Sequence, residues 1–251
     1  MTPSYVKYPA LIIISLWFIG VCPAQAELIA QSGPQRTAMI ELYSSEGCSS
    51  CVSAWQQLSK FENDSGLWTD FIPVDFRVEY WDYLGWKDKL ADPRYTDRQR
   101  QYAALWNARN IYTPEFVFNG MEWRNWTQGI PQDGDVEEPG ILTIEQGDGK
   151  TYKAVFQPAV GPTAYTAHFA LLGSDLHTKV ERGENRGRSF KAHFAVLDYQ
   201  EVLMIASSGG QFTAQADLTV PIGITAGKTG IAVFITGRDK LVPLQAAGNY
   251  L

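Results

Sequence analysis

The first half of the chain alternates short apolar runs with amphipathic stretches. Residues 37–43, 71–78 and 115–120 are mostly apolar, β-branched or aromatic, which predicts three buried strands, the last one leading into a turn. Between these runs, apolar side chains recur every three or four residues, as they do on one face of a helix. The order strand, helix, strand, helix, strand predicts a mainly parallel sheet covered by helices.

The two predicted helices have recognisable starts. The first begins at Cys48, after a turn, and buries one face made of Cys51, Ala54, Trp55, Leu58 and Phe61. The second follows Asp92-Pro93, which supplies a capping side chain and a first-turn proline. Its inward side chains are expected to be Tyr95, Tyr102, Leu105 and Trp106.

The second half of the chain has the pattern of an all-β protein. Residues 141–145 and 151–156 flank Gly147-Asp148-Gly149, which is a strong hairpin signal. Short strands at this spacing predict a small sandwich. The further strand candidates are residues 164–172, 179–181, 188–197, 212–218 and 230–235.

A turn-rich acidic stretch separates the two halves. Residues 129–140 are rich in glycine, proline and acidic side chains, which is typical of a linker. We therefore predict one domain over residues 27–134 and a β-rich domain over residues 135–251.

The N-terminus has the pattern of a secretory signal peptide over residues 1–26. Lys7 precedes an apolar run over residues 10–21, and Ala24-Gln25-Ala26 forms a cleavage site before Glu27. An uncleaved membrane anchor and a lipid-modified Cys22 remain as alternatives. We expect an exported protein, periplasmic or secreted, without stable membrane insertion after cleavage, because later apolar runs are too short to cross a bilayer.

Charge and cysteine content narrow the function. A formal net charge of -6 argues against a nucleic-acid binder, since phosphate contacts need a basic surface. Cleavage before Glu27 leaves Cys48 and Cys51 as the remaining cysteines. A bridge across two intervening residues constrains the unfolded chain very little, so the spacing favours redox chemistry over structural cross-linking.

The position of the pair suggests distinct roles for its two sulfurs. At a helix start, unpaired N–H groups and the helix dipole lower the pKa of Cys48, which makes it the attacking thiolate. Cys51 would then resolve the mixed disulfide, and Gly47 would let a substrate backbone approach. We predict no metal ligands and no cofactor, because the three histidines all lie in the second half. An inert disulfide and a zinc or copper site remain as alternatives.

A resemblance strengthens the redox interpretation. Tyr112-Thr113-Pro114 resembles the loop of thioredoxin-like proteins in which a cis-proline faces the C-x-x-C pair. The resemblance implies that Thr113 and Pro114 present substrate backbone, with Tyr112 beside them.

Three motifs resemble a bacterial family of secreted proteins known as domain of unknown function 1223. They are residues 41–51, the run 80–88 leading to Arg98-Gln99 and to residues 112–114, and residues 182–187. The resemblance implies an α/β fold, namely a thioredoxin-like domain with a C-terminal all-β, sandwich-like domain. The family supplies no established activity. Its members often have a histidine where this chain has Arg77, and an aspartate where it has Glu79.

Other candidate residues carry two interpretations each. Glu41 would take a proton from the resolving thiol, or form a structural salt bridge. Trp81 and Asp82 would line a substrate groove, or pack an insertion onto the domain. Glu184-Asn185-Arg186 would form an ion-pair network between the domains, or reach over the cysteines.

We therefore expect an exported thiol–disulfide oxidoreductase that acts on protein or small-molecule thiols and disulfides. The first alternative is a non-catalytic protein that binds a ligand or partner and holds a structural disulfide. The second alternative is a metal chaperone.

Overall fold

The computed structural model describes residue 4 and residues 26–131, 137–161 and 163–251. Most of the predicted signal peptide and the centre of the predicted linker therefore lie outside the described residues. Strand β1 (Glu27–Gln31) begins at the residue after the predicted cleavage site. Across the part of the chain that the structure describes, no helix has both the length and the apolar character needed to cross a membrane.

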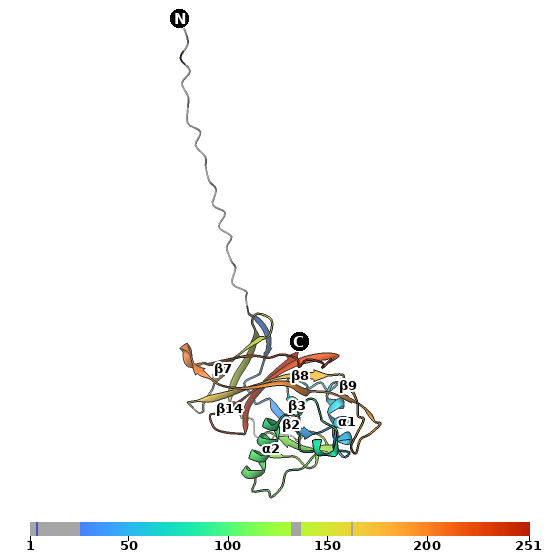
Figure 1. The fold of residues 1–251 in the computed structure, drawn as a ribbon. Helices are drawn as coiled ribbons and strands as arrows, with labels where there is room; N and C mark the ends of the chain where they lie inside the picture. The colour runs from blue at the N-terminus through green and yellow to red at the C-terminus, as the bar shows by residue number, and fades with distance from the viewer. Residues whose placement is uncertain (1–3, 5–25, 132–136, 162) are drawn as a thin grey trace.

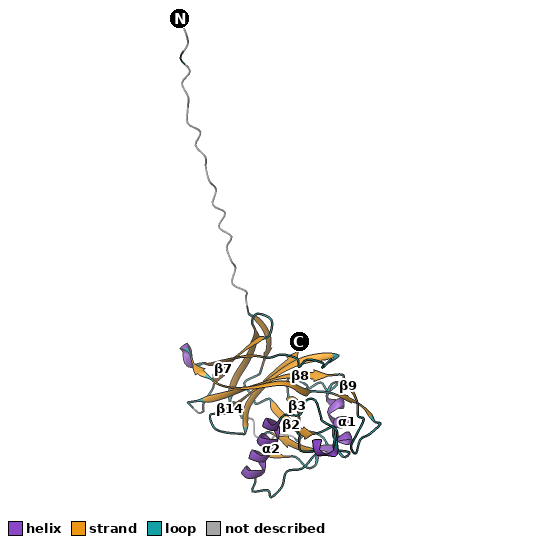
Figure 2. Ribbon diagram, viewed as in Figure 1, coloured by secondary structure: helices purple, strands orange, loops and turns teal. Residues whose placement is uncertain are grey.

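An eight-stranded sheet runs through both halves of the chain, in the order β15-β14-β8-β11-β3-β2-β4-β5. Figures 1 and 2 label four of its strands, β2, β3, β8 and β14. Strands β2 and β3 are parallel, β11 joins β3 in parallel at Ala195, and β4 is antiparallel to β2. The members are β2 (Ala38–Ser44), β3 (Phe71–Arg77), β4 (Glu115–Phe118), β5 (Met121–Glu122), β8 (Tyr165–Ser174), β11 (Ala195–Leu203), β14 (Lys228–Gly237) and β15 (Pro243–Tyr250).

A five-stranded antiparallel sheet packs against this large sheet, in the order β1-β6-β7-β13-β12. Buried side chains such as Leu142 and Phe156 from the smaller sheet share one core with Phe169 and Val233 from the larger. The remaining strands are β6 (Gly140–Gln146), β7 (Thr151–Pro158), β12 (Ile205–Ala206) and β13 (Phe212–Asp217), together with the separate hairpin of β9 (Leu176–Lys179) and β10 (Ser189–Ala192).

Two α-helices are present among the described residues, and they cover opposite faces of β2. Helix α1 (Cys51–Phe61) packs with Ile40 and Leu42, whereas α2 (Pro93–Leu105) packs with Met39 and Tyr43. Alternate residues of a strand point to opposite faces, so α1 contacts one set of alternate residues of β2 and α2 contacts the other. The part of the chain that the structure describes also contains three short 3₁₀ helices: η1 (Asp82–Leu84), η2 (Trp126–Gln128) and η3 (Ser208–Gly210).

The local predictions in the first half are largely confirmed. The five inward residues predicted for the first helix are all buried, and Asp92 caps α2 by accepting a hydrogen bond from the Arg94 amide at 2.8 Å. Leu105 is an exception, since 53% of it is exposed. In the second half, the predicted strand 188–197 is wrong, because β10 ends at Ala192 and β11 starts at Ala195.

The predicted fold class is wrong. An α/β thioredoxin-like domain followed by a separate sandwich requires a helix-covered sheet in the first half and a self-contained sheet in the second. The structure is instead mostly β, and β8, β11, β14 and β15 extend the sheet that β2 and β3 begin. Periodicity along the chain predicts where each strand lies, but not which strands lie beside it in the sheet. The pairing of strands from the two halves was therefore not predictable from it.

Candidate functional site

The two cysteines lie where β2 passes into α1. The Cys48 amide donates to the Ser45 carbonyl at 3.1 Å, and the Cys51 amide donates to the Cys48 carbonyl at 3.3 Å. These bonds close a turn over residues 45–50, which we call the cysteine turn. Helix α1 begins at Cys51, three residues later than predicted, so Cys48 lies just before the helix and Cys51 is its first residue.

The loop that contains Thr113 lies against the Cys48 sulfur. The Cys48 Sγ is 3.7 Å from the Thr113 carbonyl oxygen and 3.2 Å from the Ser50 Oγ, and the Ser50 hydroxyl also donates to that carbonyl at 3.3 Å. The peptide bond between Thr113 and Pro114 is cis. The structure therefore brings together two motifs that lie more than sixty residues apart in the sequence.

Hydrogen bonds make Cys48 the more acidic thiol. The Cys51 thiol is the largest cause, and together with Ser50 and Thr113 it outweighs burial and lowers the pKa of Cys48 from 9.0 to about 6. Burial raises the pKa of Cys51 well above 9.0, and the neighbouring Cys48 raises it further. The two thiols are therefore shifted in opposite directions, Cys48 toward its thiolate form and Cys51 toward its protonated form.

Neither cysteine reaches the surface in this structure. Cys48 and Cys51 are both 0% exposed, whereas Ser49 and Ser50 between them are exposed. The attack on a substrate that was predicted for Cys48 is therefore blocked in this conformation. A disulfide substrate can reach Cys48 only if the cysteine turn or the loop opposite it moves.

The predicted insertion beside the cysteines forms part of their surroundings. The Trp81 Nε1–H donates to the Thr113 hydroxyl at 2.7 Å, and the Asp82 Oδ1 accepts from the Asp88 amide at 3.2 Å. A Cβ at Gly47 would lie 2.8 Å from the Trp81 Cβ, so Gly47 makes room for Trp81 rather than for a substrate backbone. Trp81 therefore orients the loop that faces Cys48, and Asp82 holds the insertion together.

Helix α2 fixes the other side of the same loop. The Gln99 Nε2 donates to the Tyr112 carbonyl at 2.7 Å and to the Glu115 Oε2 at 2.6 Å, on either side of Pro114. The Tyr112 ring points elsewhere, since its hydroxyl donates to the Glu122 Oε1 at 2.7 Å. Its backbone, rather than its side chain, therefore belongs to the candidate site.

Glu41 lies on the face of β2 that α2 covers, away from α1. Its carboxylate accepts hydrogen bonds from Arg98 at 2.7 and 2.9 Å, from Tyr102 at 2.6 Å and from Tyr43 at 2.8 Å. Burial alone would raise its pKa, but Arg98 and the two hydroxyls lower it. None of the contacts found for Glu41 among the described residues involves a cysteine, so these contacts fit a structural ion pair.

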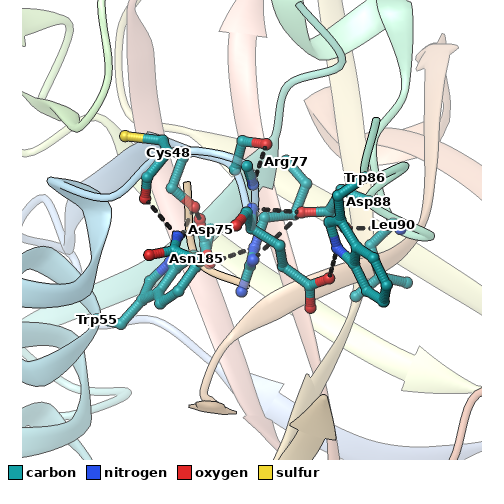
Figure 3. Close-up of polar contacts among 12 residues, drawn as sticks. Cys48, Trp55, Asp75, Arg77, Trp86, Asp88, Leu90 and Asn185 are labelled. Atoms are coloured by element: carbon teal, nitrogen blue, oxygen red, sulfur yellow. Dashed lines mark hydrogen bonds and ion pairs between the residues drawn. The ribbon is translucent and has the colours of Figure 1, made fainter. Parts of the chain in front are cut away.

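The α1 face of β3 carries a buried charge cluster that the sequence analysis missed. The Arg77 guanidinium pairs with Asp75 at 2.7 Å and with Asp88 at 3.4 Å, and it lies 4.5 Å above the Trp55 ring of α1 (Figure 3). Burial raises the pKa of Asp75, against the effect of Arg77. The sequence signal was Asp75 and Arg77 at alternate positions of an otherwise apolar strand, which places both on one face.

This cluster reaches the cysteine turn through Glu46. The Glu46 amide donates to the Asp88 Oδ2 at 3.0 Å, and the Glu46 carboxylate accepts from the Trp86 Nε1 at 2.9 Å. Burial and the nearby Asp88 raise the pKa of Glu46. The conformation of the turn therefore depends on side chains from β3 and from the 81–88 insertion.

One group of side chains has the composition of a metal site, but it lies apart from the cysteines. Ligand atoms of Glu62, Asp175 and His193 lie within 4.8 Å of one another. Both carboxylates already pair with lysines, Glu62 with Lys228 at 3.4 Å and Asp175 with Lys191 at 2.5 Å. These contacts fit an ion-pair cluster, and we assign it no metal.

The fold and the site define a mostly β protein that carries a buried pair of thiols in the turn between a strand and a helix. The chain belongs to the family described as "Protein of unknown function (DUF1223)", whose sequence model matches residues 39–236. The family predicted from the sequence motifs is therefore confirmed. A search of curated proteins finds no match.

Two solved structures are similar in fold. Protein AGR_C_4864 from Agrobacterium tumefaciens is 21% identical, with a TM-score of 0.55, and the match covers 86% of this chain and 94% of that chain. HBP35 of Porphyromonas gingivalis is 14% identical, with a TM-score of 0.62, and the match covers 88% of this chain and 76% of that chain. At these identities the likeness concerns the fold alone.

Proposed function

We propose that this protein is a thiol–disulfide oxidoreductase that uses Cys48 and Cys51. The observation that carries the proposal is the position of the Cys48 Sγ, which lies 3.2 Å from the Ser50 Oγ and 3.7 Å from the Thr113 carbonyl oxygen, just before the helix that begins at Cys51. The opposite pKa shifts of the two thiols, lowered for Cys48 and raised for Cys51, agree with it. The proposed substrate is a protein or a small molecule with a disulfide or a pair of thiols.

The proposed reaction has two displacement steps. The Cys48 thiolate attacks one sulfur of a substrate disulfide, forms a mixed disulfide and expels the other substrate sulfur, which takes up a proton. Cys51 then loses its proton, attacks the Cys48 sulfur and expels the second substrate sulfur. The substrate gains two electrons and two protons, and Cys48 and Cys51 become a disulfide. The reverse steps oxidise a substrate dithiol.

The neighbours of Cys48 have roles in this reaction. The Ser50 hydroxyl and the Thr113 side chain lower the pKa of Cys48. The 112–114 loop is the surface against which an incoming disulfide would lie once the turn opens. Glu41 is not included, because its carboxylate is held by Arg98 on the other face of the sheet.

Matched cysteine variants test the proposal. Oxidised glutathione and a disulfide-bonded protein serve as substrates for the wild type, Cys48→Ser and Cys51→Ser. We expect Cys48→Ser to abolish turnover and Cys51→Ser to accumulate the mixed disulfide. A third variant, Cys51→Ala, removes the Cys51 hydrogen bond, so the pKa of its Cys48 should rise by about one unit, measured by thiolate absorbance against pH. Unchanged turnover in Cys48→Ser would disprove the proposal.

The complete burial of both sulfurs favours a second candidate, a binding protein in which the pair is purely structural. The reduction potential separates the two. A value between about -120 and -270 mV is the range of working redox proteins, whereas a value below about -300 mV is typical of structural disulfides.

Export is the remaining part of the proposal. The pattern of residues 1–26 supports a cleaved signal peptide and a periplasmic or secreted location. Mass spectrometry of the protein purified from its own cell envelope or medium should find Glu27 as the first residue. An intact Met1 or a lipid on Cys22 would contradict it.

A further inference from the structure

The connection between β9 and β10 reaches the cysteine turn from the second half of the chain. This segment, residues 182–187, is one of the family motifs, and the proposed reaction gives it no role. Two of its side chains, Glu184 and Asn185, bond to backbone atoms immediately around Cys48.

Asn185 fixes the backbone on both sides of Gly47. Its side chain is completely buried, and its Nδ2 donates to the Glu46 carbonyl at 2.9 Å and to the Cys48 carbonyl at 3.0 Å (Figure 3). Its Oδ1 accepts from Arg188 at 3.1 Å, which orients the amide so that its donor group faces the turn. In Figure 3 the Cys48 sulfur points away from this contact, so Asn185 acts on the turn and not on the sulfur itself.

Glu184 adds a negative charge at the residue after Cys48. Its Oε2 accepts from the Ser49 amide at 3.0 Å. The Ser49 amide lies two residues before the first residue of α1, so this carboxylate lies next to the start of the helix, where a negative charge is favoured. A carboxylate in this position opposes a second negative charge on the neighbouring sulfur.

We propose that Asn185 and Glu184 are positioning residues that set the reactivity of Cys48 in opposite directions. Asn185 holds the cysteine turn in the conformation that stabilises the thiolate, and Glu184 limits that stabilisation. The proposal rests on the proposed redox function for its purpose, but it concerns a property of the thiol that is measured without any physiological substrate.

Glu184→Gln is the sharper test, because it keeps a hydrogen-bond acceptor and removes the charge. The matched control is Glu181→Gln, which makes the same charge change at another exposed position nearby. The readout is the alkylation rate of Cys48 by iodoacetamide against pH, on the reduced full-length protein. We expect the midpoint of Glu184→Gln to fall by about 0.3–0.7 pH unit, the size of an exposed charge effect, and that of Glu181→Gln to stay unchanged.

Asn185 is tested by two variants, because Asn185→Ala removes two buried hydrogen bonds and therefore also lowers stability. Arg188→Met is milder, since it removes the side chain that orients the Asn185 amide, and Arg186→Met is its charge-matched control on an exposed side chain of the same loop. We expect the alkylation midpoint to rise in Asn185→Ala and, by less, in Arg188→Met. A merely structural role would lower the urea midpoint of unfolding and leave the alkylation midpoint unchanged.

The outcomes separate this inference from the proposed function. If Glu184→Gln and Arg188→Met move the midpoint no more than their controls do, the inference is wrong, whatever the wild type does with disulfides. If the midpoints shift as expected while the wild type turns over no disulfide, the positioning roles stand and the proposed function fails.

Discussion

The two faces of strands β2 and β3 both bury acidic side chains, but the pKa values of those acids shift in opposite directions. On the α2 face, the Glu41 carboxylate pairs with Arg98, and the pKa of Glu41 is lowered. On the α1 face, one cation, Arg77, serves Asp75 and Asp88, and the pKa of Asp75 is raised. Both acids are completely buried, so burial alone does not decide the direction.

The difference shows that the cations and hydrogen-bond donors around each buried acid set the direction of its pKa shift. Glu41 has one cation of its own and two hydroxyl donors, which favour its charged form. Such an ion pair fits a role in stabilising the fold. An acid that shares its cation, or has none, is less strongly stabilised in its charged form, and Asp75 on the face that carries the cysteines is such an acid. We therefore expect changes on the α2 face to affect stability, and changes on the α1 face to affect thiol chemistry as well.

The largest expected effect is the loss of the α2-face cation. Arg98→Met leaves the Glu41 carboxylate buried without a counter-charge, which should cost about 3–5 kcal/mol of unfolding free energy. The matched control is Arg100→Met on the same helix, whose exposed pair with Asp97 should contribute at most about 1 kcal/mol. Urea unfolding of both variants measures the difference. An equal loss of unfolding free energy in the two variants would show that the buried Glu41–Arg98 pair contributes no more than an exposed pair.

The comparison of the two faces also explains how far the sequence analysis could go. Strand alternation was visible, and it placed Glu41 with Met39 and Tyr43 and opposite to Ile40 and Leu42. Because β2 is buried on both faces, alternation could not show which set faces α1, so the proton-transfer and salt-bridge interpretations of Glu41 both stayed open. The contact of Asn185 with the turn depends on a fold-back of more than 130 residues, which no local pattern encodes.

The same reasoning applies to the fold and to the Thr113 loop. The helix face of α1 and the cap of α2 depend on neighbouring residues, and both were predicted correctly. The parallel pairing of β11 with β3 depends on residues far apart in the chain, and it overturned the predicted fold class. The placement of Thr113 beside Cys48 followed from the family resemblance rather than from any pattern in the residues.

Glu115 sharpens the comparison, because it shares the α2 face with Glu41 but accepts from the neutral Gln99. Burial raises its pKa from 4.5 to about 7. The folded protein then holds a proton that the unfolded chain has lost, so this group makes stability fall as pH rises from 4.5 to about 7. Glu115→Gln should remove that fall, measured by urea unfolding across this pH range.

Glu122→Gln is the control for this measurement. Glu122 is a near neighbour in sequence, but its pKa is lowered by Arg124 and Tyr112 despite some burial, so it has no raised titration to lose. The stability of Glu122→Gln should still fall between pH 4.5 and 7, by slightly less than that of the wild type, because Glu122 is one of the groups that raise the pKa of Glu115. A fall as large as that of the wild type in Glu115→Gln would mean that Glu115 does not cause it.

The smallest expected effect concerns Trp81, which connects the insertion to the α1 face. Trp81→Phe keeps the ring but removes the hydrogen bond to the Thr113 hydroxyl, which should cost about 1 kcal/mol of unfolding free energy. The Thr113 hydroxyl is among the groups that lower the pKa of Cys48, so a less firmly held Thr113 should also raise that pKa by a few tenths of a unit.

Trp106→Phe on the α2 side is the control, because it also removes a hydrogen bond from an indole, here to the Gly120 carbonyl. It should lower the unfolding free energy by a similar amount and leave the titration of Cys48 unchanged. An equal rise of the Cys48 pKa in both variants would show that the α1 face has no special link to the thiol.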